Sequence, residues 1–180
     1  MRLILLDRDG VINEDSDDYI KSPEEWVPIP GSLEAIAQLN HAGYRVVVLT
    51  NQSGLSRGLF DADTLARIHQ KMHQALAAVG GVVSGIFFCP HGPEDGCGCR
   101  KPAPGLFQEV AERFQATLAG VPAVGDSLRD LQAAEAVGAR PILVRTGKGR
   151  RTEAALPPGH GYPVYDDLAA AVQALLAECA

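Results

Sequence analysis

The stretch CPHGPEDGCGC, residues 89–99, gathers three of the chain's four cysteines and a histidine into eleven positions. Cys89, His91, Cys97 and Cys99 supply three sulfur atoms and a ring nitrogen, a donor set that suits a closed tetrahedral zinc site. Residues 90–101 hold no large apolar side chain, so burial cannot fold this segment. Structural zinc contributes about 10 to 16 kcal/mol, which is comparable to the cost of ordering roughly ten residues. We therefore predict a zinc-bound loop over residues 89–99 with a structural role.

The competing explanation for these thiols is that they are free or form disulfides. Cys97 and Cys99 are too close in sequence for an easy mutual disulfide, and clustered cysteines in a reducing compartment favour a metal. The fourth cysteine, Cys179, is assigned no role. His69 and His73 are four residues apart without an accompanying carboxylate, so we interpret both as solvent-exposed side chains.

Four short motifs could carry a second chemistry. They read LDRDG (6–10), LTNQSG (49–54), CRKP (99–102) and VGDSLRD (124–130). Their carboxylate, hydroxyl and ammonium groups are types that bind a phosphate and a divalent cation. Taken singly, Asp7 with Asp9 could form a solvated turn, and Asp126 could cap a helix. Thr50 and Lys101 could equally be an ordinary strand-end hydroxyl and a surface cation.

Strands must position these motifs, because each motif lies at or near the end of an apolar run. The runs at 2–6, 44–49, 85–88, 121–124 and 141–144 have the length and composition of strands buried on both faces. Helical patterns lie between them, beginning near Ser32 as an N-cap, Asp61 or Asp63, Leu106, Leu128 and Asp167. This alternation predicts an α/β fold with a doubly wound, Rossmann-like parallel sheet. We expect one domain over residues 1–180, with 147–163 as a surface loop.

Ligands of such sheets bind beyond the carboxyl ends of the strands. The strand order along the chain therefore brings the four motifs to one crevice. This convergence favours a shared function over four separate explanations.

The order of the motifs resembles the haloacid-dehalogenase (HAD) superfamily of phosphotransferases. The resemblance implies that Asp7 is a nucleophile that forms an aspartyl-phosphate and that Asp9 is the general acid and base. It also implies that Thr50 and Lys101 hold the phosphoryl oxygens. The implied ligands of a catalytic Mg²⁺ are the side chains of Asp7 and Asp126 and the backbone carbonyl of Asp9, with possible support from Asp130.

Electrostatics gives a separate reason to expect the metal ion. A phosphate dianion beside Asp7 and Asp126 meets repulsion of about 4 kcal/mol per pair of unit charges, at about 4 Å and an effective dielectric of about 20. Lys101 alone cannot offset that repulsion, whereas a divalent ion can. Mg²⁺ prefers oxygen ligands and suits this role.

The intervals between motifs leave no room for a large cap domain. Forty residues separate Asp9 from Thr50, and fifty separate Thr50 from Lys101. Expected strands and helices occupy most of both intervals. We therefore predict an open crevice, shaped by the zinc loop and by residues 13–30.

The pattern C-x-H…C-x-C-R-K-P together with LTNQSGLSRG resembles a narrower family, the D-glycero-D-manno-heptose 1,7-bisphosphate phosphatases. The likeness extends over residues 2–148 and implies removal of the 7-phosphate from a small sugar bisphosphate. It implies that Arg100 recognises the substrate. The other residues expected near the sugar are Asn51, Ser53, Arg57, Asp15 and Asp18. The cysteine loop here is shorter than in many relatives, and Ser127 replaces a lysine that many of them carry.

Two alternatives stay open. The histidinol-phosphate phosphatases share the same motifs, and their cationic substrate would suit the acidic stretch 15–18. A receiver-type phosphoacceptor switch also combines Asp, Thr and Lys with Mg²⁺, but its acceptor follows the third strand. Here Asp7 follows the first strand, and Asp9 supplies an acid for turnover, so an enzyme is favoured.

The overall charge limits the partners. A net charge of −6 argues against a nucleic-acid partner bound through a basic surface. No apolar run approaches the ~20 residues that a membrane span needs, and MRLILLDRDG suits a strand better than a signal peptide. We therefore expect a cytoplasmic protein without a membrane partner. A monomer is expected because no cap offers a dimer interface.

Overall fold

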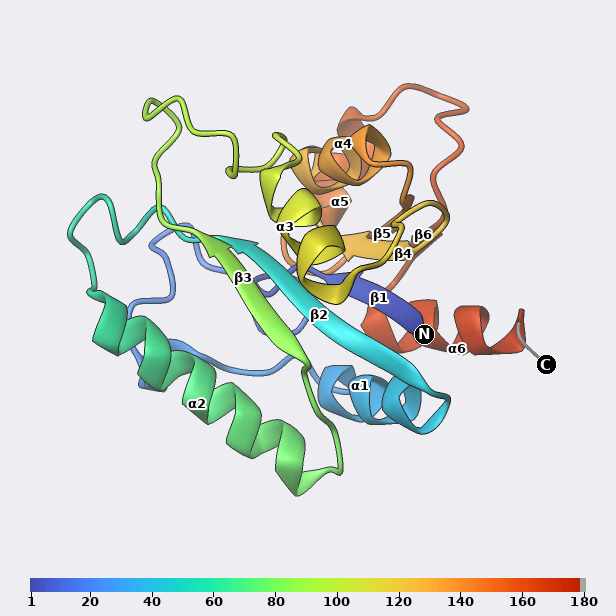
Figure 1. Cartoon of the computed structure of the whole chain (residues 1–180), viewed down its shortest axis with the longest axis horizontal. Coiled ribbons are helices and arrows are strands. Elements are labelled where there is room, and N and C mark those ends of the chain that lie inside the picture. The colour runs from blue at the N-terminus through green and yellow to red at the C-terminus, as the bar shows by residue number, and fades with distance from the viewer. Residues whose placement is uncertain (179–180) are drawn as a thin grey trace.

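Within residues 1–178, which the computed structural model describes, six parallel strands form one sheet in the order β3–β2–β1–β4–β5–β6 (Figure 1). Cys179 lies outside the described residues. In chain order the elements are β1 (Arg2–Leu6), the 3-10 helix η1 (Pro23–Glu25), α1 (Ser32–His41), β2 (Tyr44–Asn51), α2 (Ala62–Ala78), β3 (Gly85–Cys89), α3 (Gly105–Phe114), β4 (Pro122–Gly125), α4 (Leu128–Ala136), β5 (Arg140–Val144), α5 (Gly149–Ala155), β6 (Val164–Tyr165) and α6 (Leu168–Ala177). The strand order reverses between β1 and β4, as in a doubly wound sheet. The predicted fold class is confirmed.

Helices cover both faces of the sheet. In Figure 1, α1, α2 and α6 lie on one face, and α3, α4 and α5 lie on the other. Along β1, Ile4 and Leu6 join the core beneath the first group, whereas Leu3 and Leu5 join the core beneath α3 and α4. All four side chains are at most 4% exposed. Burial on both faces explains why this strand reads as an unbroken apolar run.

The polar motifs begin where the central strands end. Asp7 directly follows β1, and its backbone N–H donates to the carbonyl oxygen of Val124 in β4 (3.0 Å). Thr50 is the penultimate residue of β2, and Asp126 directly follows β4. Since these strands are parallel neighbours, the three polar residues lie at one edge of the sheet. The predicted convergence of these motifs is confirmed.

Three helix starts agree with the prediction and one does not: α4 begins at Leu128, as predicted. The capping carboxylates of Asp61 and Asp167 begin α2 and α6. The assignment of Ser32 as an N-cap is wrong, because Gly31 holds that position. The Ser32 hydroxyl instead donates to the carbonyl oxygen of Ile12 (2.6 Å), which ties α1 to the loop after β1.

The prediction of a loop over 147–163 is wrong in part, because α5 forms within it. The Thr152 hydroxyl of this short helix donates to the backbone carbonyl oxygen of Asp126 (2.7 Å). A tertiary contact with the polar end of β4 therefore stabilises a segment whose Gly-rich and Arg-rich composition favours a loop. The two-residue strand β6 was not predicted either.

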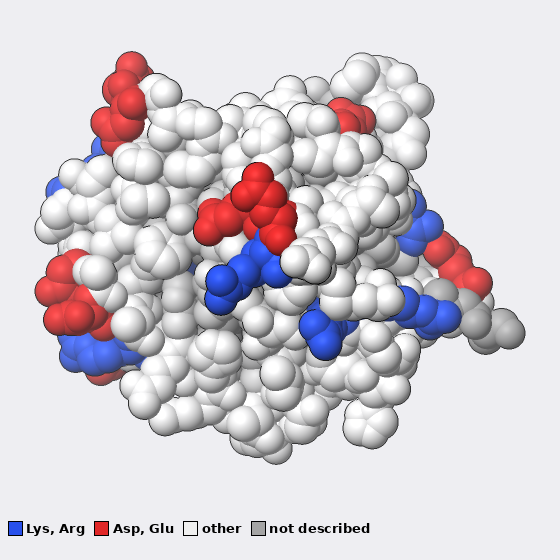
Figure 2. All heavy atoms as spheres, in the orientation of Figure 1, with Lys and Arg blue, Asp and Glu red and all other residues white. Residues whose placement is uncertain are grey.

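No second folded unit is inserted between the described strands: residues 7–31 contain only η1, and 52–84 contain only α2. The absence of a large cap is confirmed. None of the helices in residues 1–178 combines the length and the apolar character needed to cross a membrane. On the face drawn in Figure 2, the described Lys and Arg side chains form small separate groups, most of them beside acidic side chains.

Candidate active site

A cavity of about 190 Å³ opens beyond the carboxyl ends of the central strands. Its walls come from the loop after β1, the end of β2, the segment after the cysteine loop, the start of α4 and the loop before α5. The lining residues are Asp7, Asp9, Asp15, Ser16, Asp17, Tyr19, Ile20, Thr50, Asn51, Gln52, Ser53, Arg100, Lys101, Asp126, Ser127, Arg129, Asp130 and Lys148.

Lys101 lies at the floor of this cavity and is only 3% exposed. Its Nζ is 3.2 Å from Asp7 Oδ1 and 2.7 Å from Asp130 Oδ1, and it also donates to the carbonyl oxygen of Leu49 (2.8 Å). These two carboxylates raise the pKa of Lys101 although burial acts against the charged form. The ammonium group is therefore a fixed positive charge between the first and fourth motifs.

The loop after β4 is built around Asp130. Its Oδ2 accepts hydrogen bonds from the backbone N–H of Asp126 (3.1 Å), from the backbone N–H of Ser127 (3.1 Å) and from the Ser127 hydroxyl (2.8 Å). With Ser127 it forms the capping box of α4. Asp130 therefore orients Asp126, whose own Oδ2 accepts from the backbone N–H of Lys148 (2.8 Å).

Two glycines make room for Asp126. Gly10 has φ +84, and a Cβ built on it would lie 2.0 Å from Asp126 Oδ2. A Cβ on Gly147 would lie 2.3 Å from the same oxygen. Gly10 permits the turn after Asp9 because it tolerates a positive φ, and because it has no side chain the first and fourth motifs can meet.

The acidic residues carry more negative charge than Lys101 can offset. Burial, with a further contribution from Asp130, raises the pKa of Asp7 to about 7, although Lys101 opposes the shift. Burial together with Asp7 and Asp130 raises the pKa of Asp126 to about 9. Burial would also raise the pKa of Asp130, but the Lys101 charge and hydrogen bonds from Lys101 and Ser127 outweigh it, so that pKa is lowered.

This arrangement fits a divalent cation. Asp7, Asp126 and Asp130 each offer a carboxylate oxygen, and these atoms lie within 4.8 Å of one another. Oxygen donors are the ligands that Mg²⁺ prefers, and a bound divalent charge would favour the ionised forms of Asp7 and Asp126. Asp7 and Asp126 are the two side chains that the HAD resemblance implied as magnesium ligands, and Asp130 is the residue that it implied as possible support.

Asp9 lies in a different electrostatic setting from Asp7. Its carboxylate accepts from Arg8 Nε (2.8 Å), Asn13 Nδ2 (2.9 Å) and Gln52 Nε2 (3.2 Å). Burial favours the neutral acid, but the Arg8 charge and these hydrogen bonds outweigh it and lower the pKa of Asp9. Gln52 also donates to Thr50 Oγ1 (2.9 Å), so it joins the first motif to the second. Neither Arg8 nor Gln52 was predicted from the sequence as a site residue.

The interpretation of His69 as a solvated side chain is wrong. It is 8% exposed, and its Nε2 lies 3.1 Å from Arg8 Nη1. His73, one turn later on α2, is exposed as predicted. The helical spacing could have indicated that His69 is buried, because it lies four residues after Leu65 and three before Met72, both in the core.

The structure brings some of the expected sugar-binding residues to the cavity and leaves others outside its lining. Asn51, Ser53, Arg100 and Asp15 line it, but Asp18 and Arg57 do not. Asp18 is exposed, and the Arg57 guanidinium instead lies 5.8 Å from the centroid of the Tyr19 ring. Asp18 and Arg57 are therefore not part of the cavity lining, and their contact with the sugar stays a prediction.

Two cations at the cavity were missed in the sequence. Arg129 is the second residue of α4, and Lys148 precedes α5, with its Nζ 3.5 Å from Asp15 Oδ2. Arg129 lies inside the VGDSLRD motif, three residues after Asp126, and this position could have indicated that it lies near the cavity. Lys148 lies in the segment that was expected to be a surface loop.

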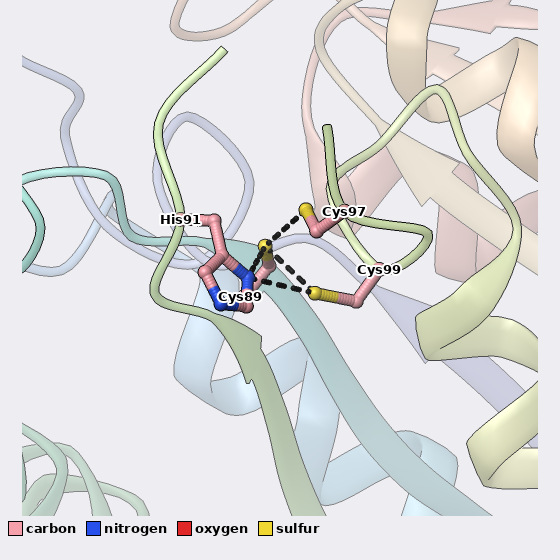
Figure 3. A group of neighbouring side chains, drawn as sticks. All are labelled: Cys89, His91, Cys97 and Cys99. Atoms are coloured by element: carbon pink, nitrogen blue, oxygen red, sulfur yellow. Dashed lines mark hydrogen bonds between the residues drawn. The ribbon is translucent and has the colours of Figure 1, made fainter. Parts of the chain in front are cut away.

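The four predicted zinc ligands meet at one point (Figure 3). Cys89 Sγ is 3.6 Å from Cys97 Sγ, 2.9 Å from Cys99 Sγ and 3.5 Å from His91 Nδ1, which lies 3.3 Å from Cys99 Sγ. Sulfurs bound tetrahedrally at about 2.3 Å would be about 3.8 Å apart, which is close to the distance between Cys89 and Cys97, whereas the Cys89 and Cys99 sulfurs lie closer together than that. The donor set therefore fits a four-coordinate zinc ion, and binding would require the Cys89 and Cys99 sulfurs to move apart.

Comparison with known proteins agrees with this geometry. A family model described as HAD-hydrolase-like matches residues 98–171, and one described as polynucleotide kinase 3 phosphatase matches residues 3–128. The D-glycero-beta-D-manno-heptose-1,7-bisphosphate 7-phosphatase of Bordetella bronchiseptica is 61% identical over 99% of both chains. The enzyme of the same name from Pseudomonas aeruginosa is 53% identical over 97% of both chains.

Solved structures similar to this chain include phosphatases of the same kind. The crystal structure of D,D-heptose 1,7-bisphosphate phosphatase from B. bronchiseptica, complexed with magnesium and phosphate, has a TM-score of 0.95 over 99% of both chains at 61% identity. The corresponding enzyme from Burkholderia thailandensis has a TM-score of 0.78 at 53% identity, over 98% of this chain and 99% of that one. The chain therefore belongs to the D-glycero-beta-D-manno-heptose-1,7-bisphosphate 7-phosphatase family of HAD-like hydrolases.

Proposed function

We propose that this protein is a magnesium-dependent phosphatase that removes the 7-phosphate of D-glycero-D-manno-heptose 1,7-bisphosphate through an aspartyl-phosphate. One observation carries the proposal: Asp7, Thr50, Lys101 and Asp126 line a single cavity in a chain that matches enzymes of this name along almost its whole length. The relatives do not favour the histidinol-phosphate alternative, and a receiver-type switch is disfavoured for the same reason.

In the proposed first step, an oxygen of Asp7 attacks phosphorus and the bond between phosphorus and the substrate's O7 breaks. A bound phosphate dianion beside Asp9 favours the protonated form of this carboxyl, against the lowering of its pKa by Arg8, and Asp9 then gives its proton to the departing alkoxide. In the second step, a water molecule attacks the aspartyl-phosphate while Asp9 takes up one of its protons. Inorganic phosphate and the Asp7 carboxylate are released. Splitting the transfer in this way replaces one difficult displacement by two easier ones.

Lys101 and Thr50 are proposed to hold the phosphoryl group. The Lys101 ammonium, fixed between Asp7 and Asp130, provides the positive charge nearest the nucleophile. Asp7, Asp126 and the backbone carbonyl of Asp9 would bind Mg²⁺, and Asp130 would support the site through Asp126. When bound, the ion offsets the repulsion between the carboxylates and the phosphate dianion.

The phosphate that is not cleaved needs its own cations. Arg100 and Arg129 both line the cavity, and burial together with the Arg129 charge lowers the pKa of Arg100. Two guanidinium groups at one cavity favour a second anion, since an anion would relieve their mutual repulsion. We therefore propose that these two arginines recognise the second phosphate of the bisphosphate.

The cysteine loop is proposed to bind structural zinc through Cys89, His91, Cys97 and Cys99. Because Arg100 and Lys101 directly follow Cys99, a folded loop would deliver both cations to the cavity. We also propose that residues 1–180 act as one domain, as a monomer and in the cytoplasm.

Phosphate release from defined substrates tests the proposal. We expect a clearly higher kcat/KM for heptose 1,7-bisphosphate than for histidinol phosphate, with ³¹P NMR showing loss of the 7-phosphate. Asp7→Asn should abolish turnover without unfolding the protein. A preference for histidinol phosphate, or a stable stoichiometric phosphoprotein without turnover, would overturn it.

A further inference from the structure

A fully buried cation lies directly behind the proposed acid and base. Arg8, between Asp7 and Asp9, has 0% exposure, although it follows a strand end at a polar cavity. Its Nε donates to Asp9 Oδ1 (2.8 Å) and its Nη2 donates to Asp9 Oδ2 (3.1 Å). This two-point contact sets the position and the plane of the Asp9 carboxylate.

The other end of the same guanidinium contacts α2. Arg8 Nη1 lies 3.1 Å from Nε2 of His69, and both side chains are buried. Arginine can only donate, so His69 Nε2 must accept, which requires a neutral ring with its proton on Nδ1. Burial and the Arg8 charge lower the pKa of His69 to about 3, in agreement with a neutral ring. A helix outside the cavity thus reaches the Asp9 carboxylate through one buried arginine.

We propose that His69 is a positioning residue for the reaction: by accepting a hydrogen bond from Arg8, it fixes the guanidinium that orients Asp9. This inference rests on the proposed acid and base role of Asp9. Each oxygen of the Asp9 carboxylate also accepts one amide hydrogen bond, Oδ1 from Asn13 and Oδ2 from Gln52. Arg8 contacts both of these oxygens and joins them to His69 on α2.

The geometry explains why the loss of His69 would displace the Asp9 carboxylate. Without an acceptor at position 69, Arg8 Nη1 keeps a buried donor without its partner, and the side chain gains from rotating toward another acceptor. Any such rotation breaks the two-point contact with Asp9. Proton transfer depends on hydrogen-bond reach to the leaving oxygen, so a small displacement of Asp9 has a large kinetic effect.

The decisive measurement separates proton transfer from general disruption of the site. An alkyl phosphate such as the heptose 7-phosphate group has a poor leaving group and depends on protonation by Asp9. The leaving group of 4-nitrophenyl phosphate departs without an acid, so kcat/KM for this substrate reports the rest of the site. We expect His69→Leu to lower kcat/KM for the heptose bisphosphate about tenfold, part of the 10²- to 10⁴-fold that a general acid supplies. The loss for 4-nitrophenyl phosphate should stay within about twofold.

Three further variants complete the experiment. His69→Gln keeps an acceptor oxygen toward Arg8, so its kcat/KM for the heptose bisphosphate should be restored most of the way from that of His69→Leu to that of the unchanged protein. If His69→Leu does not fold, His69→Gln becomes the informative variant. His73→Leu changes the same residue type one turn later on the exposed side of α2 and should leave kcat/KM unchanged for both substrates. Asp9→Asn provides the reference pattern for losing the acid.

The outcomes are separable. A substrate-selective loss in His69→Leu, with rescue by His69→Gln, supports the inference. Equal losses for both substrates, no loss at all, or an equal loss in His69→Gln overturns it. If Asp9→Asn hydrolyses heptose bisphosphate normally, the proposed role of Asp9 fails first, whatever the His69 variants show.

Discussion

The side-chain amide of Asn51 makes two hydrogen bonds to the backbone of Lys101. Its Nδ2 donates to the Lys101 carbonyl oxygen (3.1 Å), and the Lys101 N–H donates to its Oδ1 (3.0 Å). This pair joins the end of β2 to the residue that follows the cysteine loop. Asn51 was expected to contact the sugar, but the contacts show that its amide is engaged in positioning Lys101.

We therefore predict that Asn51→Ala lowers kcat/KM about tenfold or more, because Lys101 loses the anchor that holds its ammonium beside Asp7. Asn40→Ala is a matched control. Asn40 makes the same kind of two-sided contact, with the carbonyl of Tyr44 and the N–H of Val82, away from the cavity. Both variants should lower the free energy of unfolding by about 1 to 3 kcal/mol in urea denaturation. Equal kinetic losses in the two variants would contradict a positioning role for Asn51.

Gly10→Ala should disable the metal site. The added Cβ meets the Asp126 carboxylate, whose oxygen would lie 2.0 Å away, so one of the two must move. Gly43 is the matched control, since it has φ +85 but no atom within 4 Å of a built Cβ. Both alanines bear the backbone strain of about 1 to 2 kcal/mol. Only Gly10→Ala should weaken Mg²⁺ binding, measured by calorimetry, at least tenfold; normal Mg²⁺ affinity in this variant would argue against Asp126 as a ligand.

Removal of Mg²⁺ should make stability depend on pH. The pKa of Asp7 is raised to about 7 and that of Asp126 to about 9, above the ordinary aspartate value near 3.8. A raised pKa means that the folded state binds protons more tightly than the unfolded state. The contribution of these two groups to the free energy of unfolding is therefore fully present below about pH 4, and it is lost as the pH rises toward 9. The free energy of unfolding of the EDTA-treated protein should fall between pH 6 and pH 9.

Added Mg²⁺ should remove most of that decline, because a bound divalent cation stabilises the ionised carboxylates. Urea denaturation at pH 6 and pH 9, with and without Mg²⁺, measures the effect. EDTA should also abolish phosphatase activity, and Mg²⁺ should restore it. Stabilisation by Mg²⁺ that is the same at both pH values would mean that Asp7 and Asp126 are not the groups responsible.

Local sequence patterns predicted most of this fold because the strands are buried on both faces. Residues 3–6 and 121–124 are apolar throughout, and a polar residue directly follows each of the two strands, Asp7 after β1 and Asp126 after β4. The short helix α5 escaped prediction, since its composition is that of a loop and it is held by Thr152 on Asp126. Such a contact joins residues far apart in sequence, and no local pattern records it.

The same distinction holds for the candidate site. Groups such as Asp7 and Lys101 were found because fixed motifs carry them. The contact between Arg8 and His69 was not predicted, because it joins the loop after β1 to α2 across sixty residues and depends on burial that charge alone disfavours. The predicted sugar contact of Arg57 stays a prediction, since its guanidinium lies over the ring of Tyr19, which lines the cavity.

Zinc removal should unfold the cysteine loop and leave the sheet folded. We expect about one zinc per chain by elemental analysis, and Cys97→Ser should reduce both the zinc content and the kcat/KM for the heptose bisphosphate. Only the Cys89 ligand belongs to a strand, so circular dichroism of the core should change little. A purified protein that binds no zinc yet retains full activity would show that the loop folds by other means.

Arg129 provides a test of the second-phosphate site. Together with Arg100 it lines the cavity, and neither guanidinium forms an ion pair with a carboxylate of the described residues. A charge-assisted contact with a phosphate is worth about 1.5 to 3 kcal/mol, which corresponds to roughly 10- to 100-fold in affinity. Arg129→Gln should therefore raise KM for the 1,7-bisphosphate by at least tenfold while leaving its kcat within about threefold. The heptose 7-monophosphate lacks the 1-phosphate and should show little change in KM.

Arg113→Gln, on the exposed side of α3, controls for the loss of a positive charge. An equal rise in KM for the mono- and bisphosphate would place Arg129 at the reacting phosphate instead, because only that group is common to both substrates.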